Sequence, residues 1–199
     1  MRAAAFLAKD PDYLERGYAV IPELLDPCEI LFIYEYFETL RAASGMGVDS
    51  QVPGSRSAYG TTGGDTLLRL ATSPLSTVAG LDLLPTYSFV RRYTTGQQLV
   101  AHRDRAECEH SATIHISASD RAPWPIKLAA LDGKVGEILL RPGDALLYRG
   151  DQLIHWRDPL NAEWYLQAFL HYVDRTGRHA DRLFDGRPTL GMNPVKNYD

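Results

Sequence analysis

The second half of the chain is a succession of short β-prone runs, and this pattern restricts the possible folds more than any other feature. Gly, Pro, Asp and Asn stand at many of the breaks, and no helical periodicity separates the runs. Closely spaced strands without intervening helices favour a sandwich or a barrel. Eight strands are the number that a jelly roll needs. We predict strands at residues 87–94, 99–105, 112–117, 125–130, 136–140, 145–148, 153–157 and 164–173.

The first half of the chain reads as helices with one strand. Residues 18–22 form a short β-prone run after a glycine. A helix is predicted to follow from Asp26 to about Gly45, because Asp26 can cap it and Glu29 can complete a capping box. Residues 65–82 predict one or two further short helices. The fold class is therefore mostly β with N-terminal helices, built on a double-stranded β-helix or jelly-roll core.

Residues 45–65 differ from their surroundings because they are rich in Gly and Ser and contain Pro53. This composition predicts a long loop, and long loops in compact domains are often lids or binding segments. Arg56 and Tyr59 within it offer contacts to an anionic or polar small molecule. A connector without a binding role is an equally good interpretation.

Length and composition fit one globular domain. The 199 residues predict a single unit with a helical part over 1–84, a jelly-roll core over 85–173 and a tail over 174–199. The net charge of −4 does not suggest nucleic-acid binding. Two cysteines imply no disulfide framework, and no apolar run approaches the length of a membrane helix. We expect a cytoplasmic protein that binds neither nucleic acid nor membrane; the sequence leaves its oligomeric state open.

Three residues in the β-rich half suggest a metal site. In a strand, residues i and i+2 point to the same face, so His102 and Asp104 would present an imidazole and a carboxylate together. A further histidine, His155, stands near the end of another predicted strand. Two histidines and one carboxylate on one face of an ion form the facial triad of non-haem Fe(II) oxygenases. A jelly roll places its second strand beside its seventh, which would complete this triad.

Several segments resemble one enzyme superfamily. Residues 86–117 contain Tyr93, a Gly-containing turn and then the His-x-Asp motif. Residues 143–160 carry a Gly-Asp strand, a turn and the distal histidine, and 166–174 resemble the last barrel strand. Residues 17–27 resemble the first strand and helix. Together these segments are similar to the 2-oxoglutarate- and Fe(II)-dependent oxygenases of the prolyl-hydroxylase-like type.

The resemblance implies an activity and a set of cofactors. It implies Fe(II) at the triad, 2-oxoglutarate as cosubstrate and O₂ as oxidant, with hydroxylation of an aliphatic C–H bond as the outcome. The substrate would be a small molecule, an amino acid or a peptide. A cupin-like barrel that binds a metal or ligand without oxygenase activity is the alternative, since residues 143–155 would suit many such barrels.

The resemblance also implies a base about ten residues after the distal histidine, to hold the far carboxylate of 2-oxoglutarate. Residues 164–167 contain no base, which is a departure from the family pattern. Arg157 is the best substitute, because it follows His155 by two residues and would share its face, about 6.6 Å along the strand. The alternative is an outward-facing Arg157 paired with Asp158.

Two further residues are candidates for the cosubstrate site. Arg91 is the second choice for the anchoring base, since it shares a strand face with Tyr93. The resemblance implies that Tyr93 hydrogen-bonds the cosubstrate, while a buried aromatic with a satisfied hydroxyl is an equal alternative. The group formed by Glu107, Cys108, Glu109 and His110 matches no zinc spacing, so we expect structural hydrogen bonding there.

Overall fold

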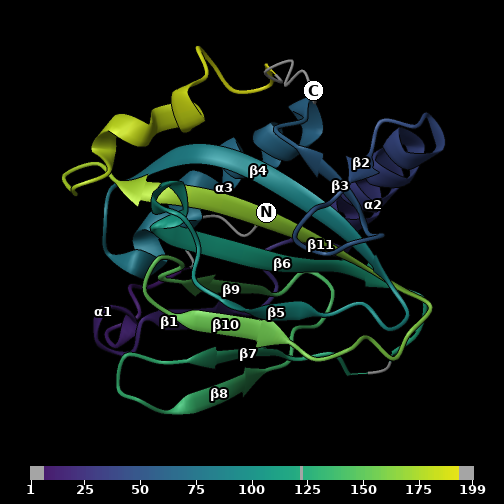
Figure 1. The fold of residues 1–199 in the computed structure, drawn as a ribbon. Coiled ribbons are helices and arrows are strands. Elements are labelled where there is room, and N and C mark those ends of the chain that lie inside the picture. Colours follow the sequence, from purple (N-terminus) through teal and green to yellow (C-terminus); the bar gives the residue numbers. More distant parts are fainter. Residues whose placement is uncertain (1–6, 122, 193–199) are drawn as a thin grey trace.

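The computed structural model describes residues 7–121 and 123–192, which form two β-sheets that face each other (Figure 1). Neighbouring strands are antiparallel throughout the larger sheet. In spatial order this sheet contains β1 (Tyr18–Ile21), β9 (Ala145–Tyr148), β6 (His110–Ala118), β11 (Trp164–Asp174), β4 (Leu83–Thr94), β3 (Arg56–Tyr59) and β2 (Gly47–Val48).

The smaller sheet completes the barrel. Its order is β5 (Leu99–His102), β10 (Ile154–Arg157), β7 (Ile126–Ala129) and β8 (Val135–Ile138), again antiparallel. All eight predicted strands are present as β4 to β11, and each sheet contains four of them, as in a double-stranded β-helix. The predicted fold class is therefore confirmed.

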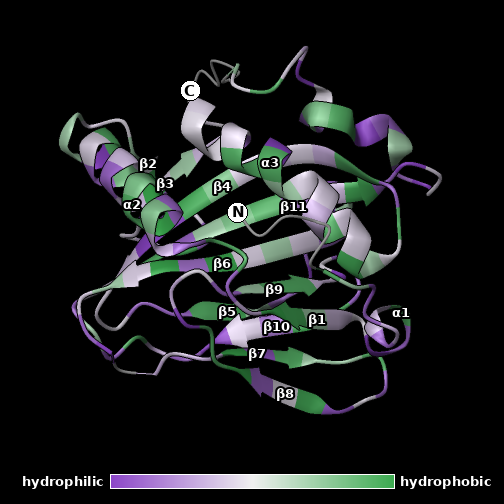
Figure 2. Cartoon of the chain, turned by 180° about the vertical axis from the view of Figure 1, so that it is seen from behind, coloured by the Kyte–Doolittle hydropathy of each residue, from purple (hydrophilic) through white to green (hydrophobic). Residues whose placement is uncertain are grey.

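Helices cover the outer face of the larger sheet. They are α1 (Tyr13–Arg16), α2 (Pro27–Ala42) and α3 (Thr62–Ala79), and Figure 2 shows α2 and α3 lying over β4, β11 and β6. The predicted capping box starts α2: the Asp26 side chain accepts hydrogen bonds from the backbone N–H groups of Cys28 and Glu29, at 2.8 and 2.9 Å. Among the described residues, no helix is long and apolar enough to cross a membrane.

The prediction of one long loop over residues 45–65 is wrong. This segment forms β2 and β3, and β3 extends the larger sheet by pairing with β4. It also contains the start of α3, where the Thr61 side chain accepts a hydrogen bond from Gly64 N at 3.1 Å. Because its other neighbour is the two-residue edge strand β2, the pairing of β3 depends on β4 rather than on its own Gly- and Ser-rich composition. Residues 65–82 contain one helix that continues through Pro74, and no second one.

The largest cluster of buried apolar residues lies outside the barrel, between the helices and the larger sheet. Strand β11 shows the division: Leu166, Ala168, Leu170 and Tyr172 belong to the core that includes α3. The alternate residues of β11 face the barrel interior, where they meet polar groups of the other strands. Five buried polar or charged residues with interior partners are Arg91, His155, Arg157, Gln167 and His171.

The C-terminal part of the described chain folds back onto α3 and β4. It contains the 3₁₀ helix η3 (Ala180–Gly186), followed by Arg187. The Arg187 guanidinium pairs with Asp65 at 2.7 Å, and both side chains are buried. Over its described residues, 174–192, the predicted tail thus contacts the larger sheet and α3. Residues 1–6, 122 and 193–199 of the predicted domain lie outside the described residues.

Candidate metal centre

Strands β5 and β10 bring the three predicted metal ligands together. His102 and His155 are direct partners in the register of these two strands, and their ring centroids lie 4.3 Å apart. Asp104 Oδ1 lies 3.4 Å from His102 Nε2 and 3.5 Å from His155 Nε2. Ligands with bonds of about 2.1 Å on one octahedral face are about 3 Å apart, so the three atoms can share one ion. Their role as ligands remains a prediction.

Asp104 reaches this position differently from the way the sequence suggested. Strand β5 ends at His102, so the strand alternation does not extend to Asp104. Instead, the backbone N–H of Asp104 donates to Gly150 O at 2.9 Å. A short 3₁₀ helix, η2 (Ala106–Cys108), follows directly.

Backbone carbonyls fix the orientation of both imidazoles. His102 Nδ1 lies 2.8 Å from Val100 O, and His155 Nδ1 lies 3.0 Å from Leu153 O. A carbonyl can only accept, so each Nδ1 carries the proton and each Nε2 presents a lone pair toward Asp104. Metal-binding histidines commonly have such a second hydrogen bond.

The electrostatics of the centre favour a divalent cation. Burial opposes ionisation of Asp104, but the neighbouring imidazoles of His102, His155 and His171 lower its pKa to about 2. Burial lowers the pKa of His155, which keeps this imidazole neutral at pH 7. Asp104 and His155 therefore present a carboxylate and a neutral nitrogen, the protonation states in which these groups bind metal.

The centre opens into a cavity of about 430 Å³. Its walls include the aromatic side chains of Tyr87, Phe89 and Phe169. Asp49 and Gln51, from the segment between β2 and β3, form another part of the wall, and Gln51 Nε2 lies 3.0 Å from His102 Nε2. The sequence pointed to this segment but not to these two residues, because their contacts depend on how β3 joins the sheet.

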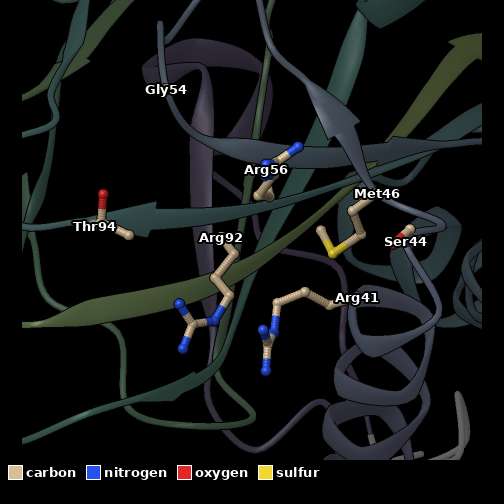
Figure 3. A pocket seen from close by; sticks show the side chains of 7 residues that line it. All are labelled: Arg41, Ser44, Met46, Gly54, Arg56, Arg92 and Thr94. Atoms are coloured by element: carbon tan, nitrogen blue, oxygen red, sulfur yellow. The ribbon is translucent and has the colours of Figure 1, made fainter.

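The residues that the sequence did select in this segment lie elsewhere. Tyr59 donates a hydrogen bond to Asp185 of η3. Arg56 lines a separate hollow of about 310 Å³ on the outer face of the larger sheet, with Arg41 and Arg92 among its other side chains (Figure 3). The residues lining that hollow include no His, Cys, Asp or Glu, so it offers no ligands for a metal.

Arg157 lies in the barrel interior and is only 1% exposed. Its guanidinium donates to Trp124 O and, at 3.4 Å, to Gln167 Oε1. It also lies 4.5 Å from the Trp124 ring centroid. Within the described part of the chain, its Nε has no hydrogen-bond partner. The alternative of an outward-facing Arg157 is wrong, because Asp158 pairs with Lys127 at 2.7 Å instead.

Arg91 is also buried, but its charge is balanced by this chain. Asp49 Oδ2 lies 2.5 Å from it, and Gln51 Oε1 accepts a hydrogen bond at 2.7 Å. Its remaining nitrogen donates to Tyr93 Oη at 3.0 Å. The Tyr93 side chain is fully buried, and its ring packs edge-on against Trp124 with centroids 4.8 Å apart.

Comparisons with known proteins agree with this architecture. No family model and no curated protein matches the sequence. Among solved structures, a prolyl-4-hydroxylase from Pseudomonas putida matches with 15% identity and a TM-score of 0.63, over 83% of this chain and 96% of that one. The α-ketoglutarate-dependent carbocyclase SnoK of nogalamycin biosynthesis matches with 14% identity and a TM-score of 0.73, over 95% and 96%. This chain has the fold of these enzymes.

A third similar structure is HygX from Streptomyces hygroscopicus, with nickel and 2-oxoglutarate bound. It shares 17% identity and a TM-score of 0.64, over 82% of this chain and 85% of that one. At these identities the likeness establishes the double-stranded β-helix fold. The chemistry of this chain must be argued from its own residues.

The residues that follow Asp104 in the sequence form hydrogen bonds and ion pairs with other parts of the chain. Glu107 pairs with Arg105 and Arg182 at 3.2 and 3.1 Å, and His110 Nδ1 lies 2.8 Å from the Tyr13 hydroxyl. Cys108 differs from them because it forms a second close group with Asp104 and His171, whose ligand atoms lie within 4.8 Å of one another. The sequence missed this group because His171 stands on β11, far along the chain.

Proposed function

We propose that this protein is a 2-oxoglutarate- and Fe(II)-dependent oxygenase that hydroxylates an aliphatic C–H bond. The observation that carries the proposal is the convergence of His102, Asp104 and His155 at the wall of a cavity. Three protein ligands on one face leave the opposite face of an octahedral ion open for cosubstrate and O₂. When bound there, the iron and 2-oxoglutarate together supply the oxidant. The chain supplies the ligands, the cavity and the groups that orient the cosubstrate.

Arg157 is the proposed anchor for the far carboxylate of 2-oxoglutarate. A buried charge is costly unless it is paired, yet the groups around Arg157 in the described part of the chain are a carbonyl, an amide oxygen and the aromatic side chains of Trp124 and Tyr165. Its Nε, which has no hydrogen-bond partner among the described residues, adds an unsatisfied donor. A carboxylate ligand that accepts two parallel hydrogen bonds would balance the charge of Arg157 and give its Nε an acceptor. Arg157 also shares β10 with His155, two residues along, which suits a five-carbon diacid that reaches from the metal.

Tyr93 and Arg91 have different parts in this proposal. The Tyr93 ring and Arg157 both pack against Trp124, and the Tyr93 hydroxyl accepts a hydrogen bond from Arg91. We propose that it contributes a hydrogen bond to the cosubstrate. Arg91 is the weaker candidate for the anchor because Asp49 already balances its charge.

The aromatic walls of the cavity favour a small molecule, an amino acid or a short peptide as substrate. Burial of an apolar side chain against Tyr87, Phe89 and Phe169 would place a C–H bond near the triad. A cytoplasmic location belongs to the same proposal, and both Cys28 and Cys108 are free thiols. The acidic net charge supports neither a nucleic-acid nor a membrane partner.

The test is Fe(II)-dependent conversion of 2-oxoglutarate to succinate, measured with a panel of amino acids, peptides and small aromatic metabolites. We expect a low basal rate that the true substrate class stimulates, and no succinate above background from a His155→Ala variant. The Arg69→Gln variant is the matched control, since Arg69 is an exposed residue of α3 that lines none of the cavities described above. A wild-type protein that binds metal but forms no succinate would favour the cupin-like binding barrel instead.

A further inference from the structure

The two oxygens of the Asp104 carboxylate have different surroundings. Oδ1 faces the Nε2 atoms of His102 and His155. Oδ2 lies 3.0 Å from the Ser111 hydroxyl, which donates a hydrogen bond to it. One oxygen is thus available to a metal, and the other is held by the protein.

Ser111 is in turn held by His171. The two residues are direct partners across β6 and β11, and Ser111 Oγ lies 2.9 Å from His171 Nδ1. A serine hydroxyl has a single proton. Because that proton goes to the charged Asp104 oxygen, the strongest acceptor nearby, His171 Nδ1 must carry a proton and donate it to Ser111. A longer contact of 3.3 Å joins Ser111 Oγ to Cys108 O.

Gly150 leaves the space that this arrangement needs. Its carbonyl accepts the hydrogen bond from the Asp104 backbone N–H. A Cβ atom at Gly150 would collide with Asp104 Oδ2, and it would lie 2.7 Å from Ser111 Oγ and 2.5 Å from Cys108 O. No real side chain tolerates contacts this short, so the path from His171 through Ser111 to Asp104 requires glycine at this position.

The same contacts account for the second group of potential ligands. Within the group of Asp104, Cys108 and His171, Asp104 Oδ2 and His171 Nδ1 are both occupied by Ser111. Cys108 Sγ lies 3.0 Å from the Tyr87 hydroxyl, and the Tyr87 ring packs against His171 in a tilted arrangement with centroids 4.4 Å apart. The group is therefore built as hydrogen-bonded support behind the facial triad.

We infer that Ser111 and His171 are positioning residues that make Asp104 a ligand through one oxygen only. The inference rests on the proposed iron site. An octahedral ion with three protein ligands keeps three open positions, which a chelating cosubstrate and O₂ would fill. If both oxygens of Asp104 bound the ion, one of those positions would be lost. Ser111 and His171 would therefore protect an open coordination position without touching the metal.

The first test measures Co(II) binding to the metal-free protein by titration and by visible absorption, which reports the coordination number. We expect Ser111→Ala to weaken Co(II) binding about ten- to hundredfold, the usual effect of removing a partner of a metal ligand. We also expect its absorption bands to change, because the freed Asp104 oxygen can bind the ion. Ser111→Thr keeps the hydroxyl and should restore both the affinity and the spectrum.

A pair of substitutions at His171 separates the hydrogen bond from packing. His171→Asn retains an N–H donor near the Nδ1 position but loses the ring that packs against Tyr87. His171→Phe retains a ring in contact with Tyr87 but loses the donor. If positioning acts through the hydrogen bond, the Asn variant will keep a near-normal Co(II) affinity and spectrum while the Phe variant will not. The opposite order would overturn the inference in favour of simple packing.

Controls distinguish this inference from the proposed function. Ser117→Ala, elsewhere on β6, should leave Co(II) binding unchanged. If the wild-type protein binds no Co(II), or if Asp104→Ala binds it normally, the proposed metal site itself is wrong. Normal wild-type binding with a Ser111→Ala affinity within twofold of it would overturn the positioning role alone. A second equivalent of Co(II) that is lost in Cys108→Ser would show that the support group binds metal, which also contradicts the inference.

Discussion

Arg91 and Arg157 lie inside the same barrel, but their charges are balanced in different ways. Both side chains are almost fully buried, at 3% and 1% exposure. Arg91 is enclosed by an acid, an amide and a phenol of this chain, with Asp49 at 2.5 Å. Arg157 contacts a backbone carbonyl and an amide oxygen, and lies over the rings of Trp124 and Tyr165.

This difference suggests that Arg91 is a structural cation and that Arg157 binds a ligand. Aromatic faces stabilise a desolvated cation by only about 2 kcal/mol, well short of the cost of burying a full charge. The Arg91 region is complete without a ligand, because Asp49 is part of it. The Arg157 region has a cation and an unused donor but no anion among the described residues, so it is completed by a ligand that carries a carboxylate.

The largest expected effect concerns the proposed metal site, because 2-oxoglutarate would bind the metal at one end and Arg157 at the other. His155→Ala removes one of three ligands at the other end of the proposed cosubstrate site. We expect no measurable succinate formation, and a Co(II) affinity lowered by more than about a hundredfold. Titration with Co(II) and a succinate assay check this. Retained binding would mean that the ion lies elsewhere and that Arg157 has no partner across the cavity.

Substitution of the two arginines tests the comparison directly. Arg157→Ala should raise the 2-oxoglutarate KM more than about a hundredfold, since loss of one partner of a buried charge pair costs about 3–5 kcal/mol. Arg157→Lys should recover part of this loss, because an ammonium lacks the planar fork. Co(II) binding should remain near normal in both variants. A KM that is instead sensitive to Arg91→Lys and indifferent to Arg157→Ala would reverse the two roles.

In the unliganded protein, substitution of Arg91 should lower the stability more than substitution of Arg157. Arg91→Met leaves the Asp49 carboxylate buried without its partner, so we expect the free energy of unfolding to fall by about 3 kcal/mol. Arg157→Met removes a charge that lacks a counter-ion, so the change should stay within about 1 kcal/mol or be favourable. Urea denaturation of metal-free protein measures both. Equal losses would show that the two arginines are equally structural.

Buried histidines make stability depend on pH, unlike the two arginines, because the protein interior keeps these imidazoles neutral. Burial lowers the pKa of His110 and of His115 to about 4. The unfolded chain takes up these protons near pH 6.5, so their stability contribution is complete above pH 6.5 and is lost between pH 6.5 and 4. Each should contribute a slope of about 1.4 kcal/mol per pH unit there. Denaturant titrations of metal-free protein should show a flatter slope for His110→Gln; an unchanged slope would mean that His110 is already protonated in the native state.

The sequence predicted those parts of the molecule that local pattern determines. Eight strands, the capping box at Asp26 and the pairing of the strands that carry His102 and His155 all follow from alternation, turn residues and the order of a jelly roll. Strand β3 was not predictable in this way, because this short strand gains its structure from pairing with β4. Gln51 and Ser111 were missed for a related reason: each acts across strands or loops, and nothing in its immediate sequence marks it.

The division of β11 has a consequence for evolution and for engineering. Leu166, Ala168 and Leu170 join the core outside the barrel, while Gln167 and Phe169 face the interior. Phe169 contributes to the cavity wall, whereas Leu166, Ala168 and Leu170 contact the helices on the other face of the same strand. Substitutions at Phe169 can therefore change the shape of the cavity without altering the contacts between the larger sheet and its helices.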